Sequence, residues 1–453
     1  MNKPKHLIFL AKINKLKNGG IIMKTEIKSI ELEKECEISG FIEKTRAQKT
    51  MLFIVLRDRS GKIQVAIEKA KMPEIAAKVE SLLKDSVIRV KGHAVSAPNV
   101  TLGGIEFVPS EIEIESEAEN LPITAESSID LRQDYRWIDL RDEKRRHIFE
   151  IRSFVESKMR EFFVSKGFIE IHTPKISAQC SEGGAEVFAI DYYGQKAYLT
   201  QSPQFYKQMA IASGFERVFE IGAQYRAEKS FTARHAAESV ACDFEMADVK
   251  SHHEVCDMEE EMLVFVLSAI KEKFGELIEK EFGLPVLVPE GRIPRFKLKE
   301  VFEIFEKEYG IKTPEAKQLD LDPEAEKLIC KYTKEKLGSE LVFITDYPAE
   351  ARAFYSKKVE GSLDCMSLDL LYRGWEMNSG AVREHRYEHL KKQIQEKGIK
   401  PELMADYLEF FKYGCPPHGG IGLGIDRFVA KLLDLPSIKE SILVFRGPSR
   451  LKP

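Results

Sequence analysis

A hairpin-like stretch of the sequence places charged side chains where they could bind phosphate groups. Residues 217–221 begin a strand, Arg226 and Glu228 stand near its end, and a polar loop containing Arg234 and His235 follows. A guanidinium group pairs with phosphate oxygens through two parallel hydrogen bonds, so the loop suits a triphosphate. A plain surface ion pair between Arg226 and Glu228 is the alternative interpretation.

A glycine-rich strand near the C-terminus is the second such stretch. Gly420, Gly422 and Gly424 alternate with apolar residues, and Arg427 follows where a helical pattern begins. Alternate glycines on a strand let another group approach the backbone closely. The spacing does not fit the dinucleotide fingerprint GxGxxG, so this strand alone is weak evidence for nucleotide binding.

The elements that would position these residues can be read from the apolar periodicity. Ile148, Ile151, Val155, Met159 and Phe162 recur at helical spacing, and Gly167 stands just after the expected helix end. A short strand over 168–171 and then Pro174 follow. Helices of this kind usually line a core, so on its own the segment assigns no function.

The N-terminal part predicts a small β-barrel. Strands are expected over 36–40, 51–56, 63–67, 87–95 and 105–114, with a helix over 73–83 between the third and the fourth. This order is that of the OB-fold, a barrel that commonly binds oligonucleotides. Small barrels also serve as plain structural modules, and both readings stay open at this point.

Composition bounds the class of protein. The chain has 453 residues, 43% hydrophobic and 31% charged, which predicts a globular protein of more than one domain. The net charge of −4 excludes a global basic field, so a nucleic acid would need a local basic patch. Seven cysteines without a CxxC pair indicate neither a zinc site nor a disulfide framework. No apolar run approaches membrane-spanning length, and we expect a cytoplasmic protein.

Four segments follow from these patterns. An acidic run over 111–119 followed by Asn120-Leu121-Pro122 indicates a connector between two domains. We expect a loose extension over 1–22, a barrel domain over 23–116, a linker over 117–133 and a larger domain over 134–453. A charged helical insertion is expected at about 250–290 of the larger domain.

The helix-strand segment, the hairpin and the glycine-rich strand stand in the order and at the separations of motifs 1, 2 and 3 of class II aminoacyl-tRNA synthetases. The chain resembles that family from about Ile30 to its end, and it is most similar to the archaeal-type aspartyl enzymes. The resemblance implies an α+β fold, with an OB-fold anticodon-binding barrel before an antiparallel sheet flanked by helices. It also implies a homodimer built through motif 1.

The resemblance extends to the pocket for the amino acid. Gln201-Ser202-Pro203-Gln204 followed by Lys207 matches the aspartyl pattern. A buried carboxylate needs cationic partners, and the family assigns that task to Lys207 and Arg383. Asparaginyl enzymes generally lack a lysine at this position. Further residues implied to contact aspartate are Glu182, Ser202, Gln204, Asp243, Ser379 and His418; of these, Glu182, Gln204 and Asp243 would hold the ammonium group, and His418 would lie near the substrate carboxylate.

For the nucleotide, the resemblance implies ATP as a substrate and Mg²⁺ as a cofactor. Arg226 would stabilise the α-phosphate and Arg427 the γ-phosphate, and with Glu228 these form the catalytic set. The implied ATP-binding residues are Arg226, Glu228, His235, Glu376, Gly424 and Arg427, and the implied magnesium ligands are Asp369, Glu376 and Ser379. Ser239 replaces an aromatic residue that the family often has, which leaves the purine contact open, with His235 as a substitute.

The resemblance implies aspartate–tRNA ligation. The expected partner is tRNA(Asp), and whether tRNA(Asn) is also charged stays open. In the barrel, Phe53 is the residue expected to stack on an anticodon base, although it could also belong to the barrel core. Three alternatives stay open: an asparaginyl enzyme, a paralog that makes an aminoacyl-adenylate for amide synthesis, and a tRNA-binding protein without catalysis. Lys207 disfavours the asparaginyl enzyme, and the N-terminal barrel disfavours the amide-forming paralog. The presence of the charged residues that catalysis needs disfavours a protein without catalysis.

Overall fold

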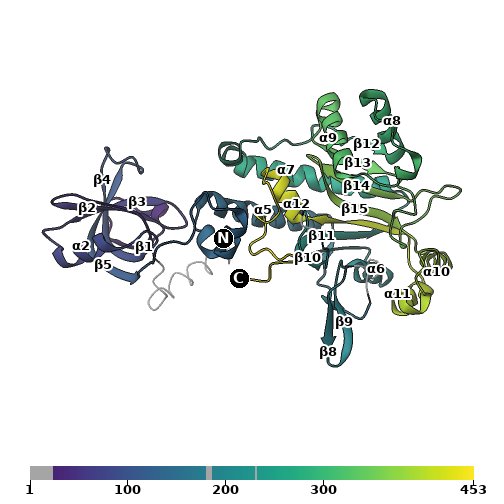
Figure 1. The fold of residues 1–453 in the computed structure, drawn as a ribbon, viewed down its shortest axis with the longest axis horizontal. Helices are drawn as coiled ribbons and strands as arrows, with labels where there is room; N and C mark the ends of the chain where they lie inside the picture. Colours follow the sequence, from purple (N-terminus) through teal and green to yellow (C-terminus); the bar gives the residue numbers. More distant parts are fainter. Residues whose placement is uncertain (1–23, 180–185, 230–231) are drawn as a thin grey trace, which may run out of the picture. The chain divides into compact units, whose positions relative to one another are not determined.

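The computed structural model describes residues 24–179, 186–229 and 232–453, and Figure 1 shows its helices and strands. The extension expected over 1–22 lies outside these residues. The chain divides into two compact units, residues 1–124 and 125–453. Each unit has hydrophobic cores of its own.

The smaller unit is a closed five-stranded barrel with the strand order β1-β2-β3-β5-β4. Side chains on β2 alternate between a buried row, Leu52, Ile54 and Leu56, and an outer row. The expected OB-fold is therefore confirmed, including the helix between the third and fourth strands. The elements are β1 (Cys36–Ala47), β2 (Met51–Arg57), β3 (Lys62–Glu68), α2 (Pro73–Ser81), β4 (Val87–Ser96) and β5 (Ile105–Ser116), preceded by a 3-10 turn, η1 (Ile27–Ser29).

An aspartate fixes the turn between β2 and β3. Asp58 Oδ1 accepts hydrogen bonds from the backbone nitrogens of Ser60, at 2.7 Å, and Gly61, at 3.0 Å. Its other oxygen accepts from the backbone nitrogen of Ile27 at 3.0 Å. Such local bonds from an aspartate favour a tight turn, so the hairpin predicted from the sequence forms here.

An eight-stranded sheet forms the centre of the larger unit, in the order β12-β13-β14-β15-β16-β11-β10-β6. The six inner strands pair antiparallel, while β6 pairs parallel with β10 and β12 with β13. Parallel neighbours need long crossover connections, and α8 and α9 supply one between β12 and β13. The strands are β6 (Ile169–Glu170), β10 (Arg217–Tyr225), β11 (Glu238–Ala247), β12 (Arg295–Lys297), β13 (Leu341–Thr345), β14 (Ser367–Tyr372), β15 (Trp375–Arg383) and β16 (His418–Gly424).

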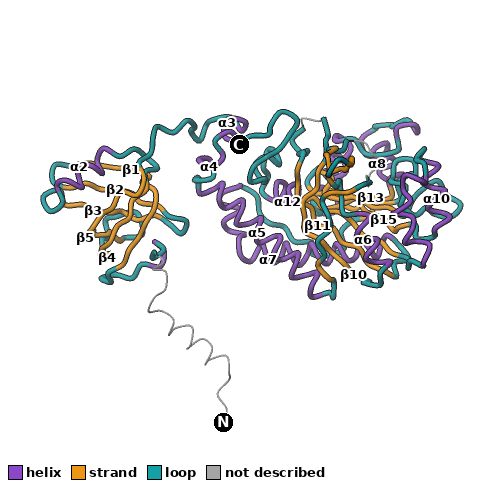
Figure 2. Tube along the Cα trace, turned by 90° about the horizontal axis from the view of Figure 1, so that it is seen from below, coloured by secondary structure: helices purple, strands orange, loops and turns teal. Residues whose placement is uncertain are grey.

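Two long helices cover one face of this sheet and lie side by side in Figures 1 and 2. The helix α5 (Glu143–Ser165) buries the predicted apolar stripe, and Gly167 after its end has a φ of +79°. The helix α7 (His252–Phe282) begins with a capping box between Ser251 and Glu254. Its apolar side chains join the main core with those of α5. The helix expected within 250–290 is thus a structural layer of the domain.

The remaining elements surround the sheet. The helices α8 (Leu298–Tyr309) and α9 (Pro323–Leu337) share a core with β13 and β14. An aromatic cluster joins α6 (Gln204–Ala212), α10 (Tyr387–Glu396) and α11 (Ala405–Glu409). The others are α3 (Ile129–Asp134), α4 (Arg136–Asp139), β7 (Ile176–Ser177), β8 (Ala189–Tyr192), β9 (Gln195–Leu199), α12 (Ile425–Leu432) and the short turns η2 (Glu315–Lys317), η3 (Pro401–Met404) and η4 (Phe410–Tyr413).

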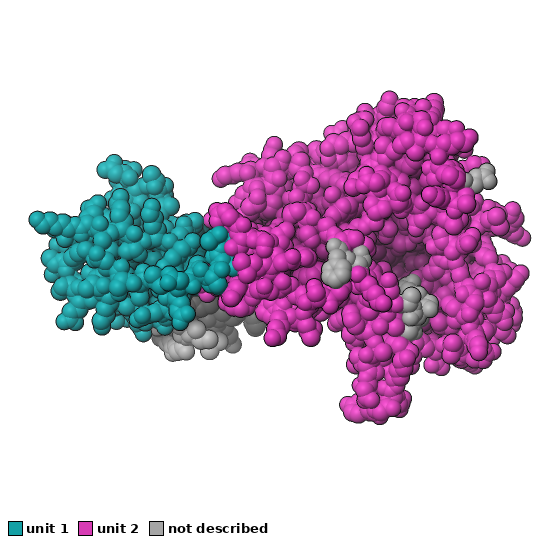
Figure 3. Space-filling model, viewed as in Figure 1, with its two compact units in different colours: residues 1–124 teal, residues 125–453 magenta. Residues whose placement is uncertain are grey.

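Figure 3 colours the two units, and the helix α3 belongs to the larger one. Arg132 of α3 is buried and forms an ion pair with Glu440 at 2.5 Å and another with Asp139 at 3.1 Å. These bonds place the last part of the expected linker, from residue 129 on, within the fold of the larger unit. Within the described residues, no helix is long and apolar enough to cross a membrane.

Candidate active site

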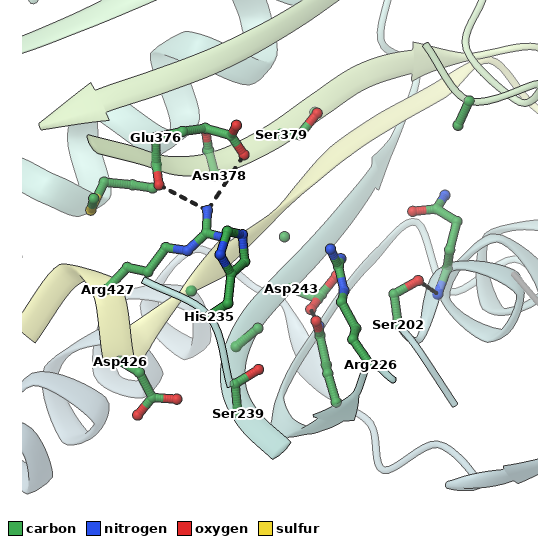
Figure 4. A pocket seen from close by; sticks show the side chains of 18 of the residues that line it. Ser202, Arg226, His235, Ser239, Asp243, Glu376, Asn378, Ser379, Asp426 and Arg427 are labelled. Atoms are coloured by element: carbon green, nitrogen blue, oxygen red, sulfur yellow. Dashed lines mark hydrogen bonds and ion pairs between the residues drawn. The ribbon is translucent and has the colours of Figure 1, made fainter. Parts of the chain in front are cut away.

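A cavity of about 330 Å³ opens over the central strands of the large sheet. Strands β10, β11, β15 and β16 supply its floor, and α6 and the start of α12 supply two of its sides. Figure 3 shows the larger unit hollowed on this face, and Figure 4 shows the side chains inside. The sequence-predicted residues that line it are Ser202, Gln204, Lys207, Arg226, Glu228, His235, Asp243, Glu376, Ser379, Arg383, Gly424 and Arg427.

Lys207 lies at the bottom of the cavity among acidic groups. Its ammonium nitrogen is 3.1 Å from Asp243 Oδ1 and 3.2 Å from Glu245 Oε2, and it donates to the carbonyl oxygen of Ile421 at 2.8 Å. The lysine is 2% exposed, so it is not a surface side chain. A cation buried this deeply persists because two carboxylates and a carbonyl oxygen surround it.

Arg383 lies next to Lys207 and shares Glu245 with it. Its Nε donates to Glu245 Oε1 at 2.9 Å, and its Nη2 donates to the carbonyl oxygen of Gly420 at 2.8 Å. Burial opposes ionisation of Glu245, but Arg383 and Lys207 hold the pKa of that carboxyl below its usual range. Bonds of Arg383 within the described chain use Nε and Nη2, which leaves Nη1 to bind a ligand.

The alternating glycines of β16 allow this cluster to form. A Cβ on Gly422 would lie 2.8 Å from Asp243 Oδ1, and one on Gly420 would lie 2.6 Å from Glu245 Oε2 and 2.0 Å from the Phe244 carbonyl oxygen. Side chains at these positions would displace the two carboxylates. The close approach predicted from the glycine pattern is therefore confirmed, and the approaching groups are acids of β11.

Gln204 offers a polar group to a ligand. The residue is 4% exposed and lines the cavity, yet its side-chain nitrogen has no hydrogen-bond partner within the described chain. A buried donor without a partner is costly, and a bound polar molecule would relieve that cost. Asp243 is buried beside it, and burial raises the pKa of Asp243 despite Lys207 nearby. Glu182, predicted to join Gln204 and Asp243, lies outside the described residues.

The hairpin of β10 and β11 forms one wall of the cavity. Arg226 follows the end of β10, and its guanidinium lies 3.8 Å from Glu228 with the side chain 45% exposed. His235 Nε2 lies 3.5 Å from Glu228 Oε2, and burial lowers the pKa of His235. Among the described lining residues the rings belong to His235 and Tyr355, and Ser239 lines the cavity without one. Exposure of the Arg226 guanidinium leaves it available to a phosphate.

Arg427 closes the opposite side of the cavity, as Figure 4 shows. It is the third residue of α12, and its Nη1 donates to the Glu376 carbonyl oxygen at 3.1 Å and lies 3.7 Å from the Glu376 carboxylate. Burial and the neighbouring Asp369 raise the pKa of Glu376 to about 7. Gly424, just before the helix, completes this side.

The predicted magnesium ligands lie on β14 and β15. Asp369 pairs with Ser379 across the two strands, and Glu376 pairs with the neighbouring Leu371. Glu376 and Ser379 line the cavity, whereas Asp369 does not. Asp369 is 2% exposed, and its carboxylate accepts hydrogen bonds from Arg352 at 2.9 and 2.5 Å. Arg352 also donates to Ser379 Oγ at 2.9 Å. Among the described residues no cluster of three His, Cys, Asp or Glu side chains could hold a metal.

His418 is placed behind the cavity and is fully buried. Its Nδ1 donates to the Pro416 carbonyl oxygen at 2.8 Å, and its Nε2 accepts from Gln208 at 2.9 Å. Burial lowers the pKa of His418 to about 4. A direct contact between this ring and a substrate, as the sequence implied, would need one of these bonds to break.

Phe53 lies on the outer face of the barrel, since it belongs to the half-buried row of β2 and not to the barrel core. The guanidinium carbon of Arg46 lies 4.8 Å from the centre of its ring. An outward-facing ring with a cation nearby suits stacking on an unpaired base. Of the two readings, barrel core or stacking platform, the structure removes the first.

Several residues in or next to the cavity were not anticipated from the sequence. Glu245 anchors both buried cations, Gln224 donates to Asp243 at 2.7 Å, and Arg352 and Tyr355 enter from the segment between β13 and β14. The alternation along β11 is the one signal that could have indicated Glu245, because it places 243 and 245 on the same face. Arg352 and Tyr355 come from an irregular segment, where periodicity gives no signal.

The cavity has a pair of buried cations at one end and Arg226, Arg234 and Arg427 toward the other, an arrangement that suits a small acid and a nucleotide. Two family models match the chain: "tRNA synthetases class II (D, K and N)" over residues 128–445 and "OB-fold nucleic acid binding domain" over 36–115. The chain belongs to the class II tRNA synthetase family, and it is therefore a ligase that uses ATP and tRNA.

Individual proteins show which members of this family the chain is similar to. The chain is 42% identical over 428 residues to the aspartate–tRNA(Asp) ligase of Pyrococcus abyssi, with 93% of this chain and 96% of that protein covered. It is 40% identical over 427 residues to the aspartate–tRNA(Asp/Asn) ligase of Methanopyrus kandleri, with 92% and 96% covered. Similar solved structures are asparaginyl-tRNA synthetase from Pyrococcus horikoshii with asparaginyl-adenylate (TM-score 0.87, 26% identity, 96% and 100% covered) and a putative aspartyl-tRNA synthetase from Leishmania major (TM-score 0.84, 26% identity, 98% and 100% covered).

Proposed function

We propose that this protein activates aspartate with ATP and transfers it to the 3′ end of tRNA. The observation that carries the proposal is the pair of buried cations, Lys207 and Arg383, on the floor of the cavity. A neutral side-chain amide would gain little from these groups, whereas a carboxylate gains two charge-assisted partners. The names of the relatives support aspartate in preference to asparagine.

In the first step, the α-carboxylate of aspartate attacks the α-phosphate of ATP in line, and pyrophosphate leaves. Arg226 stands at the mouth of the cavity with its guanidinium exposed, where it would neutralise charge on the α-phosphate. Arg427 stands on the other side, where it would hold the γ-phosphate. Such chemistry requires positioning and charge neutralisation more than a protein nucleophile.

The substrate's other groups find partners in the same cavity. Asp243 and Gln204 would hold the ammonium group, and the free Nη1 of Arg383 would bind the side-chain carboxylate with Lys207. Ser202 lies at the edge and would close the pocket on that side. His418 acts from behind, since its bond to Gln208 holds the helix that carries Lys207.

We propose that Glu376 and Ser379, which line the cavity, would hold Mg²⁺ together with the phosphates, and that Asp369 would join them once Arg352 turns away from it. Their fit rests on the donor chemistry, since oxygen ligands on adjacent strands are what this ion prefers. Burial is the main cause of the raised pKa of Glu376 and repulsion from Asp369 adds to it, and a divalent cation would relieve that repulsion. When bound, the ion would neutralise phosphate charge, and the residues named here would orient it.

In the second step, a hydroxyl of the tRNA's terminal adenosine attacks the aspartyl carbonyl, and AMP leaves. Phe53 and Arg46 would hold an anticodon base on the barrel. Some relatives are named for tRNA(Asp) and others for tRNA(Asp/Asn), so charging of tRNA(Asn) is the second candidate. Aminoacylation of the two purified tRNAs, compared at equal concentration, separates these candidates.

We propose also that the protein is a cytoplasmic homodimer. Val164 at the end of α5 is 57% exposed and Ile169 on β6 is 49% exposed, which gives the motif 1 region apolar surface to cover. Light scattering after size exclusion measures the mass directly. A monomer at micromolar concentration would contradict this part of the proposal.

The experiment that tests the aspartate pocket is the variant Lys207→Gln. We expect kcat/KM for aspartate in ATP–pyrophosphate exchange to fall about a hundredfold or more, as for the loss of a buried charge partner. Circular dichroism serves as the control that the variant folds. Kinetics for aspartate equal to those of the wild-type protein would contradict the assignment of Lys207.

A further inference from the structure

A glutamate of the α9 helix reaches the nucleotide end of the cavity from outside it. The helix α9 begins at Pro323, where the Asp322 side chain accepts from the backbone nitrogens of Glu324 and Ala325. One turn on, Glu326 is 3% exposed although it is ionisable. It does not line the cavity, so any effect on a ligand must pass through its neighbours.

Glu326 bonds to two different walls of the site. Its carboxylate accepts from Arg234 Nη1 at 2.8 and 2.6 Å, and Arg234 lines the cavity from the loop between β10 and β11. Its Oε2 also accepts from the backbone nitrogen of Glu376, at the start of β15, at 3.1 Å. One buried carboxylate thus ties the motif 2 loop to the strand that carries Glu376 and Ser379.

Arg427 completes a closed ring of hydrogen bonds through the same two walls. Its Nε donates to the carbonyl oxygen of Arg234 at 3.2 Å, and its Nη1 donates to the carbonyl oxygen of Glu376 at 3.1 Å. The ring therefore runs from Glu326 to Arg234, to Arg427, to Glu376 and back to Glu326. Each member is fixed by two others, so displacement of one moves the rest.

The helix α9 is itself held firmly against the strand end. The turn between β14 and β15 contains Gly374, whose φ is +80°. A Cβ there would lie 3.0 Å from Cγ of Lys327, the residue after Glu326. Ile329 and Cys330 of α9 share a core with Leu371 of β14. Glu326 is thus presented from a packed element and not from a loose loop.

We propose that Glu326 is a positioning residue for ATP, which sets the places of Arg234 and Arg427 at the phosphate end of the cavity. Arg234 and Arg427 both line the cavity, and Glu326 holds the first directly and the second through Glu376 and Arg234. The aspartate end, at Lys207 and Arg383, has no bond to this ring within the described chain. Glu326 therefore acts on ATP and leaves aspartate binding unchanged. The proposal rests on the proposed function, which places ATP in this cavity.

The test compares Glu326→Gln with the wild-type protein in aspartate-dependent ATP–pyrophosphate exchange. Glutamine keeps the shape but loses the charge that fixes Arg234, so we expect KM for ATP to rise about tenfold. KM for aspartate should stay within a factor of two of the wild-type value. The matched control is Glu324→Gln on the same helix, whose side chain is 83% exposed and forms an ion pair with Lys327, and it should change neither constant.

A double variant shows whether Glu326 acts through Arg234. If it does, Arg234→Gln combined with Glu326→Gln raises KM for ATP no further than Arg234→Gln alone. Thermal unfolding of each variant separates loss of fold from loss of positioning. Equal rises in the KM values for ATP and aspartate, or no change in Glu326→Gln, would overturn the proposal.

Arg427→Gln distinguishes failure of this inference from failure of the proposed function. If Arg427→Gln weakens ATP while Glu326→Gln does not, ATP binds here and the positioning role of Glu326 is wrong. If neither variant changes KM for ATP, the placement of ATP in this cavity is itself wrong.

Discussion

At the scale of single residues, two buried cations and two buried carboxylates meet at the floor of the cavity. Lys207 contacts both Asp243 and Glu245, and Arg383 contacts Glu245. The four formal charges cancel before a ligand arrives, so the cluster can stay buried without aspartate. A substrate carboxylate would then add to a preformed arrangement, and its negative charge together with its fit to Lys207 and Arg383 would decide which amino acid binds.

The geometry of Arg383 yields a test of that idea. Arg383→Lys keeps the charge but loses the planar group that bonds Glu245 and Gly420 at once. We expect kcat/KM for aspartate to fall about a hundredfold, in line with loss of a buried charge-assisted bond. Exchange kinetics at saturating ATP measure this. A lysine variant as active as the wild-type protein would show that the bidentate shape is not needed.

Arg226 allows a cleaner separation of catalysis from stability. Its side chain is 45% exposed, and its ion pair with Glu228 spans 3.8 Å, so Arg226→Ala should leave the melting temperature unchanged. Adenylate formation should fall by about 10²- to 10³-fold, as for other groups that stabilise transition-state charge. Single-turnover measurement of the adenylate checks this, and retention of most activity would remove Arg226 from the mechanism.

Residue types were a good guide to this site where they came with a strand or helix pattern. Lys207, Asp243, Arg383 and Gly424 could be predicted because regular elements carry them and the family motifs include them. Their partner Glu245 was missed, since a fully buried glutamate reads from sequence as an ordinary polar position. Arg352 was missed because the segment between β13 and β14 has no periodicity.

At the scale of elements, the helix α7 supports the strand that carries two of the proposed magnesium ligands. Glu259 of α7 is fully buried, and its Oε1 accepts from the Asn378 side chain of β15 at 2.5 Å. Asn378 also accepts from the backbone nitrogen of Leu370 at 2.7 Å, next to the bulge of β14. Glu259 thus ties a helix to both strands at an irregular point of the sheet.

The protonation of Glu259 gives a prediction for stability against pH. Burial raises the pKa of Glu259 to about 8, against 4.5 for the ordinary side chain. The folded state holds this proton more tightly than the unfolded state does. Protonated Glu259 therefore contributes fully to the free energy of unfolding below pH 4.5, and this contribution is lost as the pH rises to about 8. In Glu259→Gln this loss disappears. Its melting temperature relative to the wild-type protein should therefore increase from pH 5 to pH 8.5.

Thermal unfolding of both proteins at the two pH values checks this. The exposed Glu261 of the same helix supplies the matched control, Glu261→Gln. A difference between Glu259→Gln and the wild-type protein that does not change with pH would contradict the protonated state of Glu259.

Elements were easier to predict than their connections. The barrel strands and α5 alternate or repeat with a clear period, because each buries one face, and they form where expected. The parallel pairing of β6 with β10 and of β12 with β13 could not be predicted. The strands β6 and β12 have only two and three residues, so they have no measurable period. The role of α9 was also hidden, because one buried glutamate among exposed charges does not alter a helical pattern.

At the scale of the whole molecule, two units carry separate tasks. The barrel has its own core, and the larger unit contains the whole of the described cavity. We therefore expect changes on the barrel surface to alter tRNA recognition without altering adenylate formation. This division follows from the contacts within each unit and does not depend on how the units are placed.

Phe53→Ala tests the division. Removal of one stacking ring should weaken tRNA binding by about 1–3 kcal/mol, which is about 5-fold to about 150-fold. Filter binding with tRNA measures this, and ATP–pyrophosphate exchange without tRNA should be unchanged. The core variant Ile54→Ala is the contrast, since it should lower barrel stability. An unchanged tRNA affinity in Phe53→Ala would exclude Phe53 as a base platform.

The central claim is that the buried cations select aspartate for activation. ATP–pyrophosphate exchange by the wild-type protein without tRNA, with aspartate or asparagine as the amino acid, tests it most directly. We predict exchange that depends on aspartate, with asparagine disfavoured by about a hundredfold or more because it lacks the charge that Lys207 and Arg383 bind. Exchange with asparagine alone, or with neither amino acid, would contradict the claim.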